Sequence, residues 1–186
     1  MARVIILNGI GSVGKSSTAR ALQKLSIEPI LHVQGDAFLD MIPPQMWGHQ
    51  DGIIFEQLDL GDLKSVEIVT GSFLARLMNG MRASVAALAG TGNSCIVDDV
   101  MLTPDDQRAY QAMITDVPLQ FVGLHAPMEV LEMREQQRGD RLIGLARWQY
   151  ERVHHGIHYD FEIDTSESTP NECAKAIASA LALPIA

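Results

Sequence analysis

The chain has 186 residues, enough for one domain that buries roughly 70% of the surface of its unfolded form. Apolar residues make up 47% and charged residues 20% of the sequence, which excludes a disordered chain. The net charge is −9 and Lys and Arg form no cluster, which excludes a general nucleic-acid binder because such proteins neutralise phosphates with many cations. Any anionic ligand must therefore be bound by a local arrangement of donors.

No apolar run is long enough to cross a bilayer, and the N-terminus lacks the features of a signal peptide. The two cysteines, Cys95 and Cys173, lie far apart in apolar segments, and we interpret them as buried free thiols of a reducing compartment. We therefore expect a cytoplasmic protein with no membrane contact. A homo-oligomer is compatible with the sequence.

The chain begins with a predicted strand over residues 3–8, followed at once by Gly9-Ile10-Gly11-Ser12-Val13-Gly14-Lys15-Ser16. This segment matches the phosphate-loop pattern G-x-x-x-x-G-K-[ST] in full. Glycines let successive backbone N–H groups point into one concavity, and the helix predicted over residues 15–25 adds the positive end of its dipole. We predict that this loop, together with Ser17, binds a nucleotide.

Two side chains of the loop have chemical roles in this pattern. The Lys15 ammonium is expected to contact the β- and γ-phosphates, and the Ser16 hydroxyl is expected to bind Mg²⁺. We expect Lys15 to be largely exposed to solvent in the absence of nucleotide. The backbone dipoles, Lys15 and the metal together explain how an acidic protein holds a triphosphate.

The second predicted strand, residues 30–33, is followed by Asp36. In a doubly wound sheet the carboxyl ends of the strands face the ligand crevice. Asp36 can therefore accept the proton of an attacking hydroxyl group, a step worth about 10²–10⁴-fold in rate. Alternatively, Asp36 caps a short helix predicted near residues 38–46. The two roles are compatible.

Residues 43–62 are rich in Pro, Gly, Trp and Asp, and predict an irregular insert or hairpin beside the sheet. A long amphipathic helix is predicted around residues 63–89, because its apolar residues recur three or four positions apart. The residues of this stripe are Val66, Val69, Phe73, Leu77, Met81, Val85 and Leu88.

An acceptor pocket is predicted between residues 38–47 and the long helix. Its adaptable apolar wall would consist of Met41, Met46, Trp47, Phe55, Met78 and Met81. The alternative is that several of these residues fill the core. Residues 37–61 contain no Lys or Arg, which argues against a phosphorylated acceptor.

The predicted strand over residues 94–98 ends in two carboxylates, Asp98 and Asp99. An apolar strand that ends in Asp is the pattern of a Walker-B strand, whose carboxylate supports the Mg²⁺ ion. We favour Asp98, because it ends the apolar run directly. The alternative is an Asp that caps Thr103 or the next helix.

A helix over residues 105–114, a strand over residues 119–125 and a helix over residues 128–138 follow. Arg134, Arg138 and Arg141 recur at spacings of four and three, so a continuous helix would present them on one face. Such a segment, with Gly139-Asp140 as a hinge, can direct guanidinium groups at the transferred phosphoryl group. The alternative is a solvated face paired with Glu132 and Glu135.

The chain ends with predicted helices over residues 142–154 and 171–181 that flank a strand over residues 159–164. His154, His155, His158 and Asp160 superficially resemble a metal cluster. Zinc ligands must converge on one point, commonly from positions i and i+4 of a helix, and Gly156 is expected to end the helix between them. A loop leading into the last strand is the plainer interpretation.

The alternation of strands and helices predicts an α/β fold with a five-stranded parallel sheet and helices on both faces, the P-loop NTPase fold. No linker divides the chain, so residues 1–186 are expected to form a single domain. Within it we expect an acceptor-binding insert over residues 37–62 and a lid over residues 128–141.

Particular motifs resemble those of the chloramphenicol phosphotransferase family of P-loop kinases, nearly from end to end. They are Ile5-Ile6-Leu7-Asn8-Gly9 with the phosphate loop, Asp36, Val97-Asp98-Asp99-Val100, Arg138-Gly139-Asp140-Arg141, His154-x-Gly156 and Tyr159-Asp160-x-Glu162-x-Asp164-Thr165. The chain departs from the family at Ala37, where its known member has Ser, and over residues 43–63.

The resemblance implies a fold similar to adenylate and shikimate kinases, with a small lid and with ATP and Mg²⁺ as phosphoryl donor. It also implies transfer to the primary hydroxyl of chloramphenicol, with Asp36 as base and the arginines of residues 134–141 closing on the nucleotide. We therefore predict a kinase of a small hydroxylated acceptor. The alternatives are a kinase of another metabolite, such as a nucleoside or shikimate, and a nucleotide-dependent switch without an acceptor.

Overall fold

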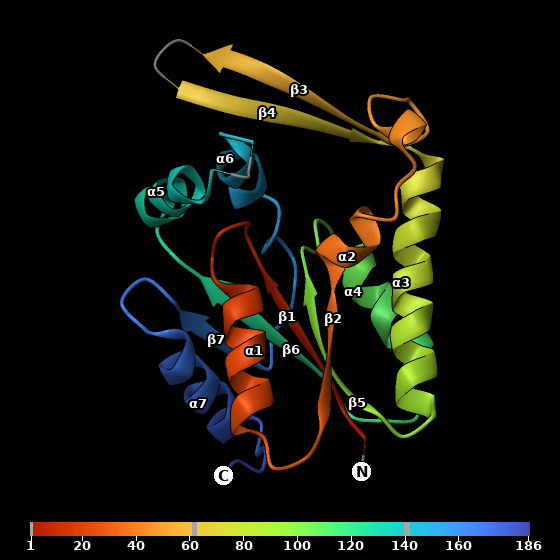
Figure 1. The fold of residues 1–186 in the computed structure, drawn as a ribbon, viewed down its shortest axis with the longest axis vertical. Helices are drawn as coiled ribbons and strands as arrows, with labels where there is room; N and C mark the ends of the chain where they lie inside the picture. Colours follow the sequence, from red (N-terminus) through yellow and green to blue (C-terminus); the bar gives the residue numbers. More distant parts are fainter. Residues whose placement is uncertain (1, 61–62, 140–141) are drawn as a thin grey trace.

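A computed structural model describes residues 2–60, 63–139 and 142–186. Its central feature is a parallel sheet of five strands in the order β2-β5-β1-β6-β7 (Figure 1). The sheet confirms the predicted fold class. Its strands are β1 (Val4–Gly9), β2 (Ile30–Gln34), β5 (Ser94–Asp99), β6 (Leu119–His125) and β7 (Phe161–Asp164).

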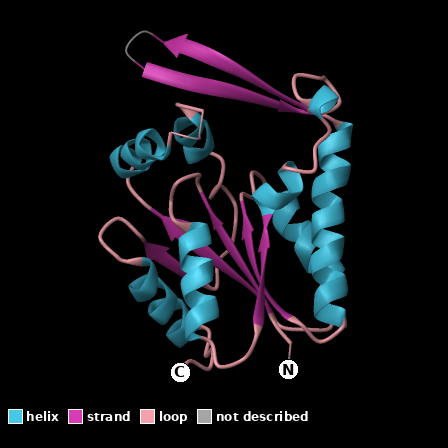
Figure 2. Ribbon diagram, viewed as in Figure 1, coloured by secondary structure: helices cyan, strands magenta, loops and turns pink. Residues whose placement is uncertain are grey.

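Helices cover both faces of this sheet (Figure 2). Helices α1 (Lys15–Leu25) and α7 (Pro170–Ala180) pack together over one face, around a core that includes Leu22 and Ile177. Helices α3 (Ser72–Gly90) and α4 (Pro104–Met113) cover the other face, where the core includes Met81. Because both faces are covered, every residue of β1 and β5 is buried, which explains why each strand contains an unbroken apolar run, over residues 4–7 and 95–97.

A two-stranded antiparallel hairpin, β3 (Ile53–Leu60) and β4 (Leu63–Thr70), stands beyond the carboxyl ends of the main strands (Figure 1). The hairpin corrects the prediction of one helix over residues 63–89, whose first eight residues are β4. Val66, Ile68, Val69 and Thr70 are β-branched and favour a strand. The helix begins only after Gly71, which packs so tightly on the backbone of Gln50 and Asp51 that a Cβ atom would lie 2.2–2.3 Å from it.

The short elements also differ from their predicted boundaries. The helix expected near residues 38–46 is two pieces, α2 (Gly35–Leu39) and a 3₁₀ turn, η1 (Pro44–Met46), because two prolines interrupt it. Helix α5 (Met128–Arg138) agrees with its prediction. Helix α6 (Leu145–Tyr150) is shorter than the predicted 142–154, since Gly144 at its start has φ of 96°. The last strand begins at Phe161 rather than residue 159.

Both cysteines are buried and carry free thiols, as the sequence predicts. Burial raises the pKa of each thiol, so both are unreactive at neutral pH. No helix in the described part of the chain has the length and apolarity that a bilayer crossing requires.

Candidate active site

The phosphate loop connects the end of β1 to the start of α1. Gly9 lies so close to β6 that a Cβ atom would be 2.7 Å from the carbonyl oxygen of Leu124. Gly14 at the start of α1 has φ of 103°, and Ser12 has φ of 67°. These left-handed residues turn the chain sharply, as a loop that surrounds a phosphate requires.

Lys15 is buried, with 7% of its surface exposed, so the expectation that it faces solvent is wrong. Its ammonium donates hydrogen bonds to the carbonyl oxygens of Gly9, at 2.7 Å, and Ile10, at 3.2 Å. The phosphate loop therefore surrounds the Lys15 ammonium. The ammonium nevertheless lines the same cavity as the loop, where a phosphate would meet it.

Asp98 and Asp99 end β5, next to β1 in the sheet. Burial opposes ionisation of Asp98, but the neighbouring His32 and Ser16 side chains and the charge of Lys15 outweigh it and lower its pKa. His32 Nε2 lies 3.5 Å from Asp98 Oδ2. Asp98 is thus an ionised carboxylate beside the Ser16 hydroxyl, the arrangement expected of a Mg²⁺ site.

Asp99 has a different environment. It accepts hydrogen bonds from the Tyr110 hydroxyl, at 2.8 Å, and from the Val100 amide, at 2.7 Å. Complete burial raises its pKa, against the effects of Tyr110 and Arg82. The helix-capping alternative applies to neither carboxylate, because Asp106 is the residue that completes the capping box with Thr103.

Asp36 lies in the first turn of α2 and is exposed to the same cavity as the phosphate loop. The residue at the N-cap of this helix is Gln34 rather than Asp36, and no side chain caps it. Gly35 brings this turn close to the end of β5, where a Cβ atom would lie 3.1 Å from the Asp98 carbonyl oxygen. The carboxyl ends of β2 and β5 thus bring Asp36 and Asp98 to one cavity.

The cavity has a volume of about 1230 Å³ and extends from the phosphate loop to the hairpin. Its far wall is apolar and is formed by α2, the hairpin and α3. The residues of this wall, here called the apolar wall, are Leu39, Ile53, Phe55, Ile68, Leu74 and Met78.

The apolar wall retains only part of the predicted acceptor pocket. Phe55 and Met78 line the cavity, but Met81 is fully buried in the core, and Met46 packs in the cluster that includes Ile53 and Leu74 without lining the cavity itself. Met41 is exposed and lines a shallow cavity elsewhere. Trp47 stacks on Phe55 with ring centroids 6.1 Å apart, so it contacts a residue of the apolar wall without lining the cavity itself.

Arg134 and Arg138 of α5 line the cavity. Arg134 is anchored, because it donates hydrogen bonds to the carbonyl oxygen of Thr165, at 2.8 Å, and to its hydroxyl, at 3.2 Å. The alternative of a solvated face fails for Glu135, which is buried and accepts two backbone N–H groups of residues 144–146. Glu132 pairs with Arg147. Arg141 and the Asp140 half of the predicted hinge lie outside the described residues.

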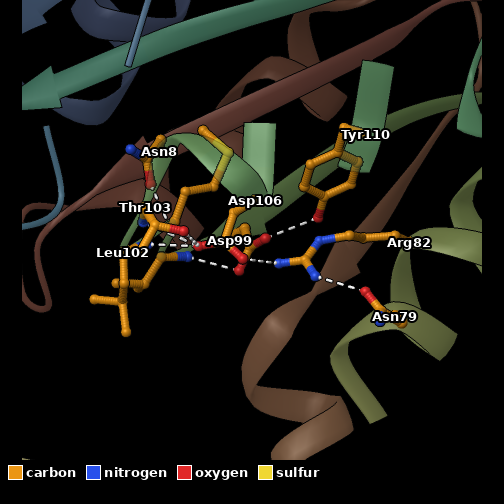
Figure 3. A network of polar contacts seen from close by, with 10 residues as sticks. Asn8, Asn79, Arg82, Asp99, Leu102, Thr103, Asp106 and Tyr110 are labelled. Carbon is orange, nitrogen blue, oxygen red and sulfur yellow. Dashed lines mark hydrogen bonds and ion pairs between the residues drawn. The ribbon is translucent and has the colours of Figure 1, made fainter. Parts of the chain in front are cut away.

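Arg82 of α3 is a cavity residue that the sequence analysis missed. Figure 3 shows its polar contacts. It donates to Asp106 Oδ1 at 2.6 Å and to Asn79 Oδ1 at 3.1 Å, and it lies 5.4 Å from the centre of the Tyr110 ring. A basic residue therefore borders the acceptor side, although residues 37–61 contain none. Because Arg82 is buried in a pair with Asp106, its charge is compensated within the protein.

Among the described residues, no group of three or more His, Cys, Asp and Glu side chains is placed to hold a metal ion. His154 Nδ1 lies 2.8 Å from the Tyr159 hydroxyl, and its ring stacks on His125 at 4.0 Å. Tyr159 in turn accepts a hydrogen bond from Asn8, the residue before the phosphate loop, at 2.6 Å. These contacts therefore connect His154 and Tyr159 to the residue that precedes the phosphate loop.

Comparisons with known proteins agree with this geometry. A family model described as chloramphenicol phosphotransferase-like protein matches residues 2–182. A Mycobacterium tuberculosis protein named provisionally as an O-phosphotransferase is 29% identical over 191 residues, covering 94% of this chain and 80% of the relative.

Two solved structures share the fold at low identity. An unliganded sugar kinase from Janibacter sp. has a TM-score of 0.73 at 17% identity and covers 98% of this chain and 96% of its own. The Mycobacterium tuberculosis APS kinase in complex with AMPPNP and APS has a TM-score of 0.67 at 14% identity, with 97% and 98% covered. The sheet and the helices that cover it thus have the same fold as these two proteins.

Proposed function

Because the chain belongs to the chloramphenicol phosphotransferase-like family, as its match over residues 2–182 shows, we propose that it is an ATP-dependent O-phosphotransferase of a small molecule. The family resemblance read from the sequence motifs is thereby confirmed. One observation carries the proposal: the phosphate loop, Asp36, Asp98 and the apolar wall line a single cavity. A donor at one end and an acceptor at the other would meet beside Asp36.

We assign residues 9–17 to the triphosphate, and Ser16 and Asp98 to Mg²⁺. The Ser16 hydroxyl and an Asp98 carboxylate that stays ionised are hard oxygen donors, which this ion prefers. When bound, Mg²⁺ would neutralise charge on the phosphate oxygens. Lys15 would exchange its bonds to the loop carbonyls for phosphate oxygens.

In the proposed reaction, the acceptor hydroxyl gives its proton to the Asp36 carboxylate as its oxygen bonds to the γ-phosphorus. The bond between that phosphorus and the bridging oxygen to the β-phosphate breaks, and ADP leaves with the electron pair. Arg134 and Arg138, from the proposed lid over residues 128–141, would balance the charge on the transferred group. The acceptor insert proposed over residues 37–62 would then extend to Thr70, the end of the hairpin.

The acceptor that fits this cavity best is uncharged and partly apolar, of the chloramphenicol type. Arg82 is already paired with Asp106, so it offers little charge to a phosphorylated or carboxylated acceptor. The Asp36 carboxylate borders the same side and would repel an anion. These contacts favour the antibiotic-like acceptor over a nucleotide or shikimate.

The test is transfer of labelled γ-phosphate to a panel of acceptors that includes chloramphenicol, shikimate and a nucleoside. We expect transfer to an uncharged alcohol, and Asp36→Asn should lower kcat by about 10²-fold or more with little change in nucleotide affinity. Asp40→Asn, an exposed residue at the end of the same helix, is the matched control and should retain full activity. Nucleotide binding without transfer to any acceptor would favour the nucleotide-switch alternative.

A further inference from the structure

Gln149 of α6 contacts the phosphate loop directly. The backbone N–H of Gly11 donates a hydrogen bond to Gln149 Oε1 at 2.7 Å. The side chain is buried, with 8% of the residue exposed, and a Cβ atom on Gly11 would lie 3.3 Å from Oε1. A glycine at this position therefore allows a close approach of the two elements.

The direction of this hydrogen bond determines how the carboxamide is oriented. A backbone N–H can only donate, so the Gln149 oxygen faces the loop and the Nε2 group is on the other branch of the carboxamide. Gln149 also lines the cavity, and no hydrogen bond of Nε2 is found within the described residues. The carboxamide thus has a donor left for a ligand.

The phosphate nearest to this donor can be inferred from Lys15. Its ammonium lies against the carbonyl oxygens of Gly9 and Ile10, and the lysine of this motif reaches the β- and γ-phosphates. Gly11 is the next residue of the loop. The part of the loop that Gln149 contacts therefore borders the terminal phosphates rather than the nucleoside.

The position of Gln149 is fixed by the packing of α6 on α5. The buried carboxylate of Glu135 accepts the backbone N–H groups of Gly144 and Ala146, both at 2.8 Å, at the start of α6. Glu135 has 3% of its surface exposed, so this connection is shielded from water. An ion pair between Arg147 and Glu132 adds a second link between the two helices. The donor is therefore preorganised, which reduces the entropic cost of using it.

We propose that Gln149 recognises the γ-phosphate: Oε1 keeps its bond to Gly11 while Nε2 donates to a γ-phosphate oxygen. This inference rests on the proposed nucleotide site. It predicts a specific role, discrimination of a triphosphate from a diphosphate. The neighbouring loop amides, which contact the α- and β-phosphates, bind both nucleotides alike.

Gln149→Glu separates this role from a structural one. A glutamate oxygen still accepts from Gly11, so the contact with the loop is retained, but an anionic oxygen replaces the Nε2 donor. Isothermal titration calorimetry with Mg²⁺ should show the Kd of AMPPNP raised by about 10- to 100-fold, the range for losing a hydrogen bond to a charged group. The Kd of ADP should change far less. Unchanged thermal unfolding without ligand would show that the fold is intact.

The matched control is Gln137→Glu, which adds the same charge to the wall of the same cavity from an exposed position on α5. Its ratio of AMPPNP to ADP affinity should equal that of the wild type. If Gln149→Glu loses the same affinity for AMPPNP and ADP, or loses affinity for neither, the proposal for Gln149 is overturned. Either result leaves the kinase assignment standing. If the wild type binds neither nucleotide, the proposed function itself fails.

Discussion

Asp98 and Asp99 are adjacent residues of β5, yet their pKa values shift in opposite directions. Successive side chains of a strand point to opposite faces of the sheet. Asp98 meets Ser16, His32 and the Lys15 charge, which lower its pKa in spite of burial. Asp99 faces α4, where burial raises its pKa and Tyr110 donates to it. Only the first of the two therefore lies beside Ser16 and Lys15, at the proposed metal site.

His154 gives a pH prediction at the same scale. Burial, the neighbouring His125 and the Lys15 charge lower its pKa from 6.5 to about 4. Between these two pH values the unfolded chain binds a proton that the folded chain does not. His154 therefore contributes stability that is fully present above pH 6.5 and is lost as the pH falls toward about 4.

The prediction is tested by thermal unfolding from pH 7 to pH 4. His154→Asn keeps a polar partner for the Tyr159 hydroxyl but cannot bind the proton, so its unfolding midpoint should fall less steeply than that of the wild type. The exposed neighbour variant His155→Asn is the control and should follow the wild type. Identical slopes for all three proteins would contradict the assigned pKa.

At the scale of elements, the β3–β4 hairpin is a second, two-stranded sheet in addition to the five-stranded sheet that carries the phosphate loop. It contributes Ile53, Phe55 and Ile68 to the apolar wall, whereas the strands of the sheet contribute the polar end of the cavity. The backbone N–H of Gly71 donates to the Gly52 carbonyl oxygen at 2.8 Å and joins the base of the hairpin to the start of α3. We therefore expect it to influence the acceptor more than the nucleotide.

Phe55→Ala tests this expectation. Removing a partly exposed aromatic ring from the apolar wall should raise the KM of the acceptor by about 10-fold, which corresponds to losing part of one apolar contact. The KM of ATP should stay unchanged, as measured by steady-state kinetics. Leu58→Ala removes a similarly exposed side chain of the same strand that does not line the cavity, and should affect neither constant. A rise in the KM of ATP with Phe55→Ala would assign the hairpin to the donor instead.

At the scale of the whole molecule, a protein of net charge −9 must offer a local site to bind an anion. The parallel sheet provides it, because the carboxyl end of β1 leads into α1, whose N-terminal amides and Lys15 face one cavity. The carboxylates of Asp36, in the turn of α2 that follows β2, and of Asp98, in β5, lie at the same end. The sheet thus brings Lys15, the proposed metal ligands and the proposed base together from segments far apart in the chain.

Nucleotide binding should consequently stabilise the entire fold. At about 100 times its Kd, Mg·ATP adds about 2.7 kcal/mol to the free energy of unfolding. For a domain of this size that corresponds to a rise of roughly 5–10 °C in Tm. Differential scanning fluorimetry against nucleotide concentration measures it. Adenosine, which lacks phosphates, should give a much smaller shift, and so should Mg·ATP with Lys15→Ala; equal shifts would argue that the phosphates are not what the loop recognises.

The sequence by itself determined the sheet, the phosphate loop and the family. These depend on local and periodic signals: an apolar strand, glycines at fixed spacing, and motifs such as Arg138-Gly139-Asp140-Arg141. The apolar stripe over residues 63–89 led to the wrong prediction of one long helix. Apolar residues three or four apart fit a helix even where β-branched residues form a strand. Gly71 marks the boundary, since only glycine fits against the backbone there.

Only the tertiary structure decided which side chains share the cavity. Arg82 and Gln149 lie 67 and 134 positions after Lys15 and belong to no motif, yet both line it. The burial of Lys15 and the contrasting pKa shifts of Asp98 and Asp99 likewise depend on neighbours contributed by other elements. The physical reason is that a motif encodes a local backbone geometry, whereas desolvation and long-range contacts arise only when the elements pack against each other.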